Sequence, residues 1–387
     1  MASFQKYETK QGSKWKFQTR VGPEKKLTTR RGFKTKKEAQ IAAAELENEV
    51  RNGTYIKEQD ILFKDFCIDW LSMYAKSAKV SSVRAREKQL DRLIDYFGQT
   101  KIKNITKLMY QNALNDLHEK GYAHNTLDGI HTSGRMVFKK AIELNMIKQN
   151  PAAGITLPKK METVEELESK EKEIKYLEKE ELGTFLNAAK ENGLDNDYAL
   201  FTLLAYSGIR TGELLALKWA DIDFEENTIS ITKTLYNPSN NKDKYQLLTP
   251  KTRGSIRSIK IDPNVMKLLK IHKAQQNELK MYTRDKYLDK DFVITKSSGH
   301  PEIIKTIQNR MQRLLKLANI EKNVTPHSLR HTHTSLLIEA GVGIKEIQQR
   351  LGHTDIETTM NIYAHMTKNM EEKASQKFSE LMKGLIF

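Results

Sequence analysis

The segment between Thr325 and Tyr363 constrains the fold most, because it combines helical periodicity with polar and cationic side chains. A threonine and a proline at 325–326 are typical of a helix start and Gly341 of a helix end, so the spacing predicts one ordinary helix. At 3.6 residues per turn, one face of this helix carries His327, Arg330, His331 and Thr334. The sequence therefore predicts a cationic, hydrogen-bonding face, with leucines turned into a core.

A second, short helix is expected at 344–351, ending at Gly352 and followed by His353. Residues 354–357 have the form of a capping box, so a third helix is expected to carry Tyr363 near its end. If these helices fold back on the first one, the pocket collects phosphate ligands, proton donors and a phenol that can act as a nucleophile. The pattern favours phosphate chemistry.

Simpler interpretations exist for single residues in this set. His327 and His331 have the i, i+4 spacing of a zinc site, but the residues between them lack the glutamate of the helical zinc-hydrolase motif. The charge of Arg330 also disfavours a cation, so no metal is expected. A lone tyrosine on an amphipathic helix usually packs or lies at the surface, so Tyr363 by itself indicates little. The combination of residues favours a phosphate site.

With these residues the chain resembles the tyrosine recombinases, the phage integrase family. The segment 327–331 is similar to the family's His-x-x-Arg box, and the segment 351–353 is similar to its Leu-Gly-His motif. The resemblance implies catalytic roles for His327, Arg330, His353 and the nucleophile Tyr363, with His331 in support. It also implies cleavage through a 3′-phosphotyrosine without metal, ATP or another cofactor, and four protomers that act through a Holliday junction.

A further group of candidate residues lies at 207–214. Gly208 and Gly212 allow a backbone turn and a helix start to approach a ligand closely, and Arg210 offers a forked donor to two phosphate oxygens. An arginine at a helix start is most often a surface residue. The whole segment, however, matches the family's first-arginine motif, which implies that Arg210 is catalytic and that Glu213 supports the site.

Short strands are expected at 228–235 and 255–261, with another between them. The family carries its catalytic lysine on a hairpin here, and Lys251 is the matching position. Lys233 and Lys244 lie nearby in the sequence, and spacing alone does not decide among the three lysines.

The net charge of +16 and a sequence pI near 9.5 indicate a polyanionic partner, most simply DNA, although a membrane surface or a ribosomal role would also suit basic charge alone. There is no apolar run of transmembrane length and no signal-peptide pattern, so no membrane is expected. Cys67 is the only cysteine, which excludes an internal disulfide. We expect a protein of the bacterial cytoplasm that associates with the nucleoid.

The first segment is strongly basic. Alternation at 14–21 predicts a strand with one apolar and one basic face, beside two more strands and a helix that begins after Thr35. Such a sheet can enter a DNA groove, with the alternative that its basic face is only solvated. The candidate DNA-binding residues are Lys14, Lys16, Gln18, Arg20, Arg30 and Arg31. The layout resembles the arm-binding domain of mobile-element integrases.

We therefore predict a multidomain α+β protein. Residues 1–56 form an arm-type DNA-binding domain, a small three-stranded sheet plus a helix; 57–157 form a helical core-binding bundle; 158–172 form a linker; and 173–387 form a mainly α catalytic domain with a small antiparallel sheet. The expected partners are double-stranded DNA with core and arm sites, and three further copies of the chain. The resemblance also suggests an excisionase and a DNA-bending host protein as accessory partners.

The predicted function is a site-specific recombinase that integrates and excises a phage or conjugative element. The apolar C-terminal tail at 378–387 is expected to insert into a neighbouring protomer, with packing on its own domain as the alternative. A type IB topoisomerase would use the same nicking and resealing chemistry. A catalytically silent DNA-binding protein would keep the basic domains but would not need the six catalytic positions together.

Overall fold

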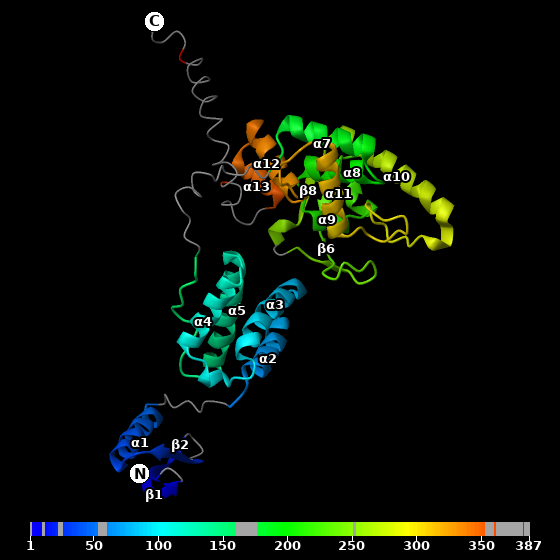
Figure 1. Ribbon diagram of the computed structural model, residues 1–387. Helices are drawn as coiled ribbons and strands as arrows, with labels where there is room; N and C mark the ends of the chain where they lie inside the picture. The colour runs from blue at the N-terminus through cyan, green and yellow to red at the C-terminus, as the bar shows by residue number, and fades with distance from the viewer. Residues whose placement is uncertain are drawn as a thin grey trace. The chain divides into compact units, whose positions relative to one another are not determined.

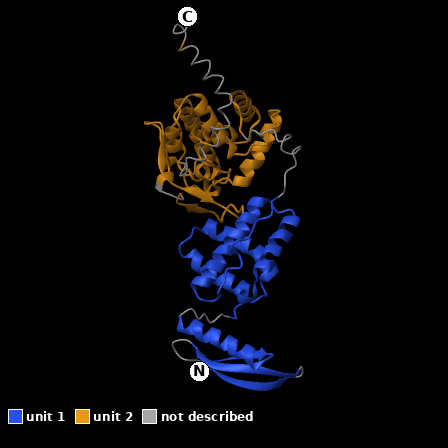
Figure 2. Cartoon of the chain, turned by 90° about the vertical axis from the view of Figure 1, so that its left-hand side faces the viewer, with its two compact units in different colours: residues 1–164 blue, residues 165–387 orange. Residues whose placement is uncertain are grey.

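The computed structural model of the chain describes residues 2–9, 12–21, 26–52, 60–159, 176–250 and 253–352, together with residues 360 and 382. The chain divides into two compact units, residues 1–164 and 165–387 (Figure 2). It is mainly helical with small antiparallel sheets, which confirms the predicted fold class (Figure 1). Within the described ranges, no helix is both long and apolar enough to cross a bilayer.

The first unit begins with a three-stranded antiparallel sheet covered on one face by a helix. The elements are β1 (Ser3–Thr9), β2 (Gly12–Val21), β3 (Lys26–Phe33) and α1 (Lys36–Arg51), with the strands in the order β1-β2-β3. Thr35 caps α1 as predicted, because its hydroxyl accepts a hydrogen bond from the backbone nitrogen of Glu38 at 3.1 Å. The core between sheet and helix is small: Phe17, Val21, Ala39, Ala43 and Leu46.

Four α-helices and one short 3-10 helix follow in the described part of the first unit. The α-helices are α2 (Phe63–Ala75), α3 (Val80–Phe97), α4 (Lys107–Glu119) and α5 (His124–Glu143), and the 3-10 helix is η1 (Ile102–Asn104). The aromatic residues at helical spacing enter one core, as predicted. Phe63, for example, stacks on Phe138 with ring centroids 5.4 Å apart and meets Phe97 edge-on at 5.9 Å.

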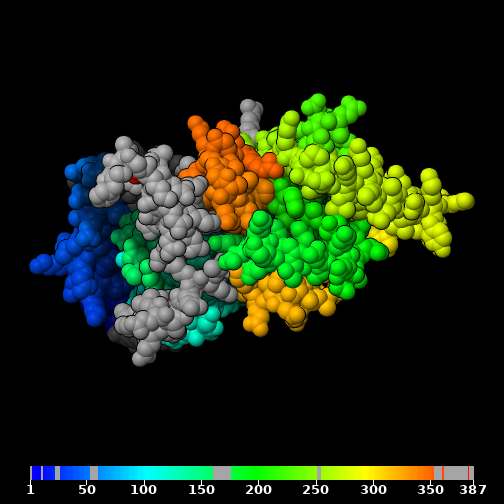
Figure 3. Space-filling model, turned by 90° about the horizontal axis from the view of Figure 1, so that it is seen from above, coloured from blue at the N-terminus to red at the C-terminus, as the bar shows by residue number. Residues whose placement is uncertain are grey.

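The second unit is built around α8, an apolar helix buried along most of its length. Among the described residues, the α-helices of this unit are α7 (Lys179–Asn192), α8 (Asp197–Ser207), α9 (Thr211–Ala216), α10 (Pro263–Thr283), α11 (Ile304–Leu317), α12 (Ser328–Glu339) and α13 (Ile344–Leu351). α8 packs against α7, α10 and α12. The C-terminal turns of α10, yellow in Figure 3, project from the unit, and Tyr282 there is 89% exposed.

Two small antiparallel sheets complete the second unit. One contains β4 (Ile222–Asp223), β5 (Thr228–Ile231) and β8 (Arg257–Lys260); the other contains β6 (Thr234–Tyr236) and β7 (Gln246–Leu248). The single strand predicted at 228–235 is therefore wrong, because the chain changes sheets after Ile231. At this break the Lys233 ammonium lies 2.6 Å from both carboxylate oxygens of Asp221. Phe292 and Thr295 form only isolated β-bridges, with Lys218 and Pro301.

The start of α12 also differs from the prediction. His327 precedes the first helical residue, so Thr325 is not the cap and the proline after it is not the first helical position. Instead, the hydroxyl of Ser328 accepts a hydrogen bond from the backbone nitrogen of Thr325 at 3.0 Å, which closes a turn ahead of the helix. The predicted end of α12 is confirmed by Gly341, whose φ of +79° suits a glycine.

Candidate active site

A tight turn between α8 and α9 places Arg210. α8 ends at Gly208, which has a φ of +64°. A β-carbon there would lie 2.6 Å from Cδ2 of His333 and 2.7 Å from Cδ2 of Leu351, so both the conformation and the space require glycine. The turn directs the chain into α9, with Arg210 at the position before its first residue.

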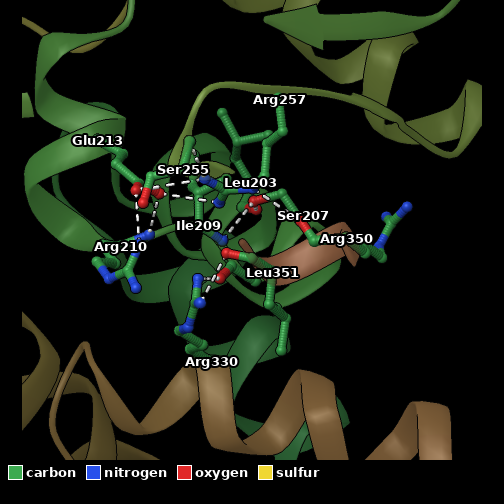
Figure 4. Close-up of polar contacts among 11 residues, drawn as sticks. Leu203, Ser207, Ile209, Arg210, Glu213, Ser255, Arg257, Arg330, Arg350 and Leu351 are labelled. Atoms are coloured by element: carbon green, nitrogen blue, oxygen red, sulfur yellow. Dashed lines mark hydrogen bonds and ion pairs between the residues drawn. The ribbon is translucent and has the colours of Figure 1, made fainter. Parts of the chain in front are cut away.

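Glu213 connects two arginines. One carboxylate oxygen accepts a hydrogen bond from the Arg210 backbone nitrogen at 3.0 Å, and the other accepts one from Nη1 of Arg210 at 2.9 Å. Nη2 of Arg257 donates to the same carboxylate at 3.0 Å. Glu213 is only 4% exposed; burial alone would raise its pKa, but its bonds with Arg257 and then Arg210 lower the pKa below the usual range. Glu213 is therefore a buried, ionised carboxylate that binds both Arg210 and Arg257 (Figure 4).

Arg330 lies inside the unit and not on an open face. Arg330 is only 2% exposed. Its Nη1 donates to the backbone oxygen of Gly208 at 2.8 Å, and its Nη2 donates to the backbone oxygen of Leu351 at 2.7 Å (Figure 4). Thr334 on the same face is also fully buried, so this part of the cationic, hydrogen-bonding face predicted for α12 lies inside the unit. Arg330 instead joins the turn before Arg210 to the end of α13.

The two histidines at the start of α12 form a pair. The rings of His327 and His331 meet edge to face, with centroids 5.2 Å apart. Burial of the ring, followed by His331, Arg330 and Arg210, lowers the pKa of His327, although part of the residue stays exposed to screening water. Burial and Arg330 also lower the pKa of His331. Both shifts favour the neutral form of the imidazoles.

The end of α13 is held by residues that the sequence analysis did not single out. Nε of Arg257 donates to the backbone oxygen of Arg350 at 2.8 Å. The Arg350 side chain in turn donates to Nε2 of His333 at 3.1 Å and to two backbone oxygens. Arg257 has no motif around it. The only sequence signal is that Arg257 lies two residues before the apolar Ile259 in β8, which puts a charged residue on the inward face of a strand.

Three predicted catalytic residues, Lys251, His353 and Tyr363, lie outside the described residues. Of the two competing lysines, Lys233 is committed to Asp221 by the ion pair at 2.6 Å. Lys244 lies exposed just before β7. In the described part of the chain, no three His, Cys, Asp or Glu side chains gather closely enough to hold a metal ion.

The strand register assigns the candidate DNA-binding residues of the first unit to faces. Lys16 of β2 stands opposite Arg31 of β3, and Gln18 stands opposite Thr29, to which it donates a hydrogen bond at 3.0 Å. Lys14, Lys16, Gln18, Arg20 and Arg31 thus share the face turned away from α1. Arg30 stands opposite the buried Phe17, so it belongs to the other face.

Comparisons with known proteins match three successive segments of the chain. Residues 175–370 match the Phage integrase family, residues 62–118 match the phage integrase N-terminal SAM-like domain, and residues 3–50 match the Arm DNA-binding domain. The chain belongs to the phage integrase family. It is a tyrosine recombinase, an enzyme of site-specific DNA recombination, as the resemblance implies.

Relatives of this family member cover nearly its whole length. It is 30% identical to a "Tyrosine recombinase XerC-like" protein of Caldanaerobacter subterraneus, over 90% of both chains. It is 29% identical to the integrase of Staphylococcus phage L54a, over 87% of this chain and 98% of that one. It is 26% identical to the ICEBs1 integrase of Bacillus subtilis, over 92% and 93% of the two chains.

Solved structures share the fold of this family member. The Tn1549 transposon integrase in complex with transposon right end DNA has a TM-score of 0.66 at 21% identity, covering 82% of this chain and all of that one. The lambda integrase tetramer bound to a Holliday junction has a TM-score of 0.56 at 17% identity, covering 90% and 95%. At these identities the likeness concerns the fold.

Proposed function

We propose that this integrase cleaves one DNA strand with Tyr363, forming a 3′-phosphotyrosine and releasing a 5′-hydroxyl. The observation that carries the proposal is the convergence of two arginines on one turn. Arg330 binds the carbonyl of Gly208, and Arg210 follows two residues later. Besides burial, both arginines lower the pKa of His327 through their charge, so a phosphate beside that ring would lie in the field of two guanidinium groups.

The chemistry follows from the charge that develops in the reaction. Attack on a phosphodiester adds negative charge to the nonbridging oxygens, and Arg210 and Arg330 are suited to stabilise it, at about 2.7–4 kcal/mol for one preorganised donor. A free tyrosine has a pKa of about 10, so Tyr363 needs a base, and a neutral His327 provides one. We assign Lys251 as the proton donor to the 5′-oxygen and His353 as a further donor to the phosphate.

The sequence of the reaction needs no external energy source. The phosphodiester that breaks is replaced by a phosphotyrosine ester, and a 5′-hydroxyl from the partner strand then displaces Tyr363 to restore a phosphodiester. Atoms and charge balance in both steps. Neither step consumes ATP.

We further infer the substrates and partners. The match of residues 3–50 to an Arm DNA-binding domain supports binding of arm sites by the basic sheet face, and site choice over the random relaxation of a type IB topoisomerase. Four copies would exchange strands through a Holliday junction and connect through their C-terminal tails. An excisionase and a DNA-bending host protein would set direction, on the nucleoid in the bacterial cytoplasm, as an element integrates or excises.

The test uses a nicked suicide DNA substrate that carries the element's end junction, without metal or ATP. We expect the intact protein to give a slower, nuclease-sensitive band on a denaturing gel, and Tyr363→Phe to give none. Tyr282→Phe is the matched control, because Tyr282 stands exposed at the end of α10, and this variant should give the band.

Other outcomes would change the assignment. A band from Tyr363→Phe would move the nucleophile to another residue. The absence of a band from every protein, despite measured binding to the same DNA, would favour a silent binder. Relaxation of plasmids that lack the junction would favour a topoisomerase.

A further inference from the structure

Arg257 uses one guanidinium group to bind three parts of the second unit. Its Nη2 and Nη1 lie 3.0 and 3.4 Å from the two carboxylate oxygens of Glu213. Nη1 also donates to the backbone oxygen of Ser255 at 3.2 Å, and Nε donates to that of Arg350 at 2.8 Å. The side chain is only 6% exposed. Through Glu213, these bonds connect Arg210 with the C-terminal end of α13.

The end of α13 needs such partners. The last carbonyl groups of a helix have no N–H donor within the helix, and they attract cations. Arg257 donates a hydrogen bond to the backbone oxygen of Arg350. Arg330 donates one to the next backbone oxygen, that of Leu351. Arg257 also lies against Gly352, where a β-carbon would be 3.2 Å from its Cδ atom. Two arginines therefore hydrogen-bond to the C-terminal end of α13.

Apolar packing alone fixes α13 only weakly. Its buried side chains form a small cluster with Ile338 of α12, namely Ile347 and Leu351, and this cluster is separate from the main core of the unit. The polar bonds at the C-terminal end thus determine where that end lies. Arg330 and Arg350 also bind this end of the helix to the rest of the unit, so we expect loss of Arg257 to shift the end without detaching it.

We propose that Arg257 is a positioning residue for strand cleavage. It fixes the end of α13 relative to Arg210, and His353 comes next in the sequence after Gly352. The inference rests on the proposed function, which gives both of those residues a place around the scissile phosphate. A displacement of about 1 Å in such a site lowers the rate by about 10²-fold.

The experiment compares Arg257→Ala and Arg257→Lys with Arg310→Lys in the full chain. Arg310 is a matched control in the same unit, since it bridges the buried carboxylates of Asp197 and Glu302 but has none of these contacts with Glu213 or α13. Single-turnover cleavage of the suicide substrate at saturating DNA gives the rate, gel shift gives the Kd, and thermal unfolding gives the folded fraction.

We expect Arg257→Ala to lower the rate per folded molecule by about 10²-fold, while the Kd stays nearly unchanged because the Arg257 side chain is buried. Arg257→Lys should recover only part of the rate, because lysine lacks the fork that spans the carboxylate and the carbonyl. Arg310→Lys should lower the unfolding temperature but leave the rate per folded molecule unchanged. Adding Glu213→Gln to Arg257→Ala should have less effect than the product of the single changes.

The outcomes separate the two levels of inference. Equal rates per folded molecule for Arg257→Ala and Arg310→Lys, beside an active wild type, overturn the positioning role alone. Full multiplicative effects of Arg257→Ala and Glu213→Gln also overturn it. A wild type that binds the DNA but forms no covalent band contradicts the proposed function and removes this inference with it.

Discussion

Nε of Arg350 donates a hydrogen bond to Nε2 of His333 at 3.1 Å, and this fixes the state of the imidazole. Because arginine cannot accept, Nε2 carries no proton, and Nδ1 of His333 donates to the backbone oxygen of Ala205 at 2.8 Å. His333 is 7% exposed. A neutral histidine is therefore built into the packing of α12 against α8.

This geometry predicts that acid destabilises the second unit. Burial, and then the charge of Arg350, lower the pKa of His333 to about 4, against about 6.5 for an unfolded chain. Between these values the unfolded state binds a proton that the folded state does not. The free energy of unfolding therefore has its full value above about pH 6.5 and falls by about 1.4 kcal/mol per pH unit below it.

Urea unfolding at several pH values between 7.5 and 5 measures this slope. The wild type should lose about 2 kcal/mol more than His333→Gln between pH 6.5 and 5. Other histidines with lowered pKa values contribute to both proteins equally. Identical slopes would mean that His333 is not the titrating group.

The ion pair of Lys233 with Asp221 predicts which lysine acts in cleavage. A lysine held at 2.6 Å by both oxygens of a carboxylate is poorly placed to give its proton to DNA. We expect Lys251→Ala to lower the single-turnover cleavage rate by about 10²–10⁴-fold, and Lys233→Ala to leave the rate nearly unchanged. A severe loss in Lys244→Ala, with Lys251→Ala active, would transfer the role to Lys244.

The two faces of the β1-β2-β3 sheet predict a contrast between neighbouring arginines. Arg31 stands opposite Lys16 on the open face, whereas Arg30 stands opposite Phe17 on the face that α1 covers. Arg31→Ala should weaken binding to arm-site DNA and reduce the slope of log K against log salt by about 1. Arg30→Ala is the control and should change neither quantity. Equal losses from both would show that DNA contacts both faces.

The turn at Gly208 predicts a large effect from a single methyl group. Gly208→Ala places a β-carbon 2.6 Å from the His333 ring at a φ of +64°, and such strain costs about 1–3 kcal/mol. Gly183→Ala in α7 is the control, because its β-carbon would meet nothing within 4 Å, and it should stabilise by about 0.5–1 kcal/mol. Thermal unfolding of both variants tests the contrast.

The sequence predicts elements well where the signal is local. The helix at 344–351 and its end at Gly352 follow from periodicity and a glycine, and the cap of α1 follows from Thr35 and Glu38. The split strand near Lys233 does not follow in this way, because the ion pair with Asp221 joins residues whose distance in space the sequence does not give.

The candidate site shows the same division. Arg210 and Arg330 lie in recognisable motifs, but the partners of Arg330 are backbone oxygens far away in the sequence, which no side-chain pattern encodes. Arg257 lies in no motif, and its partners Glu213 and Arg350 are also distant in the sequence. The placement of Arg30 and Arg31 on opposite faces, in contrast, is predictable from the sequence, since adjacent residues of a strand point to opposite sides.

The small core beneath the β1-β2-β3 sheet has a thermodynamic consequence. Its core contains only five buried side chains, of which Phe17 is the largest. A domain with so small a core is only marginally stable by itself. Any ligand that binds only the folded sheet shifts its folding equilibrium, by about 2.7 kcal/mol at a hundredfold excess over Kd. Arm DNA would then act as a folding cofactor for the segment that recognises it, and protease resistance of residues 3–50 would report occupancy of the arm site.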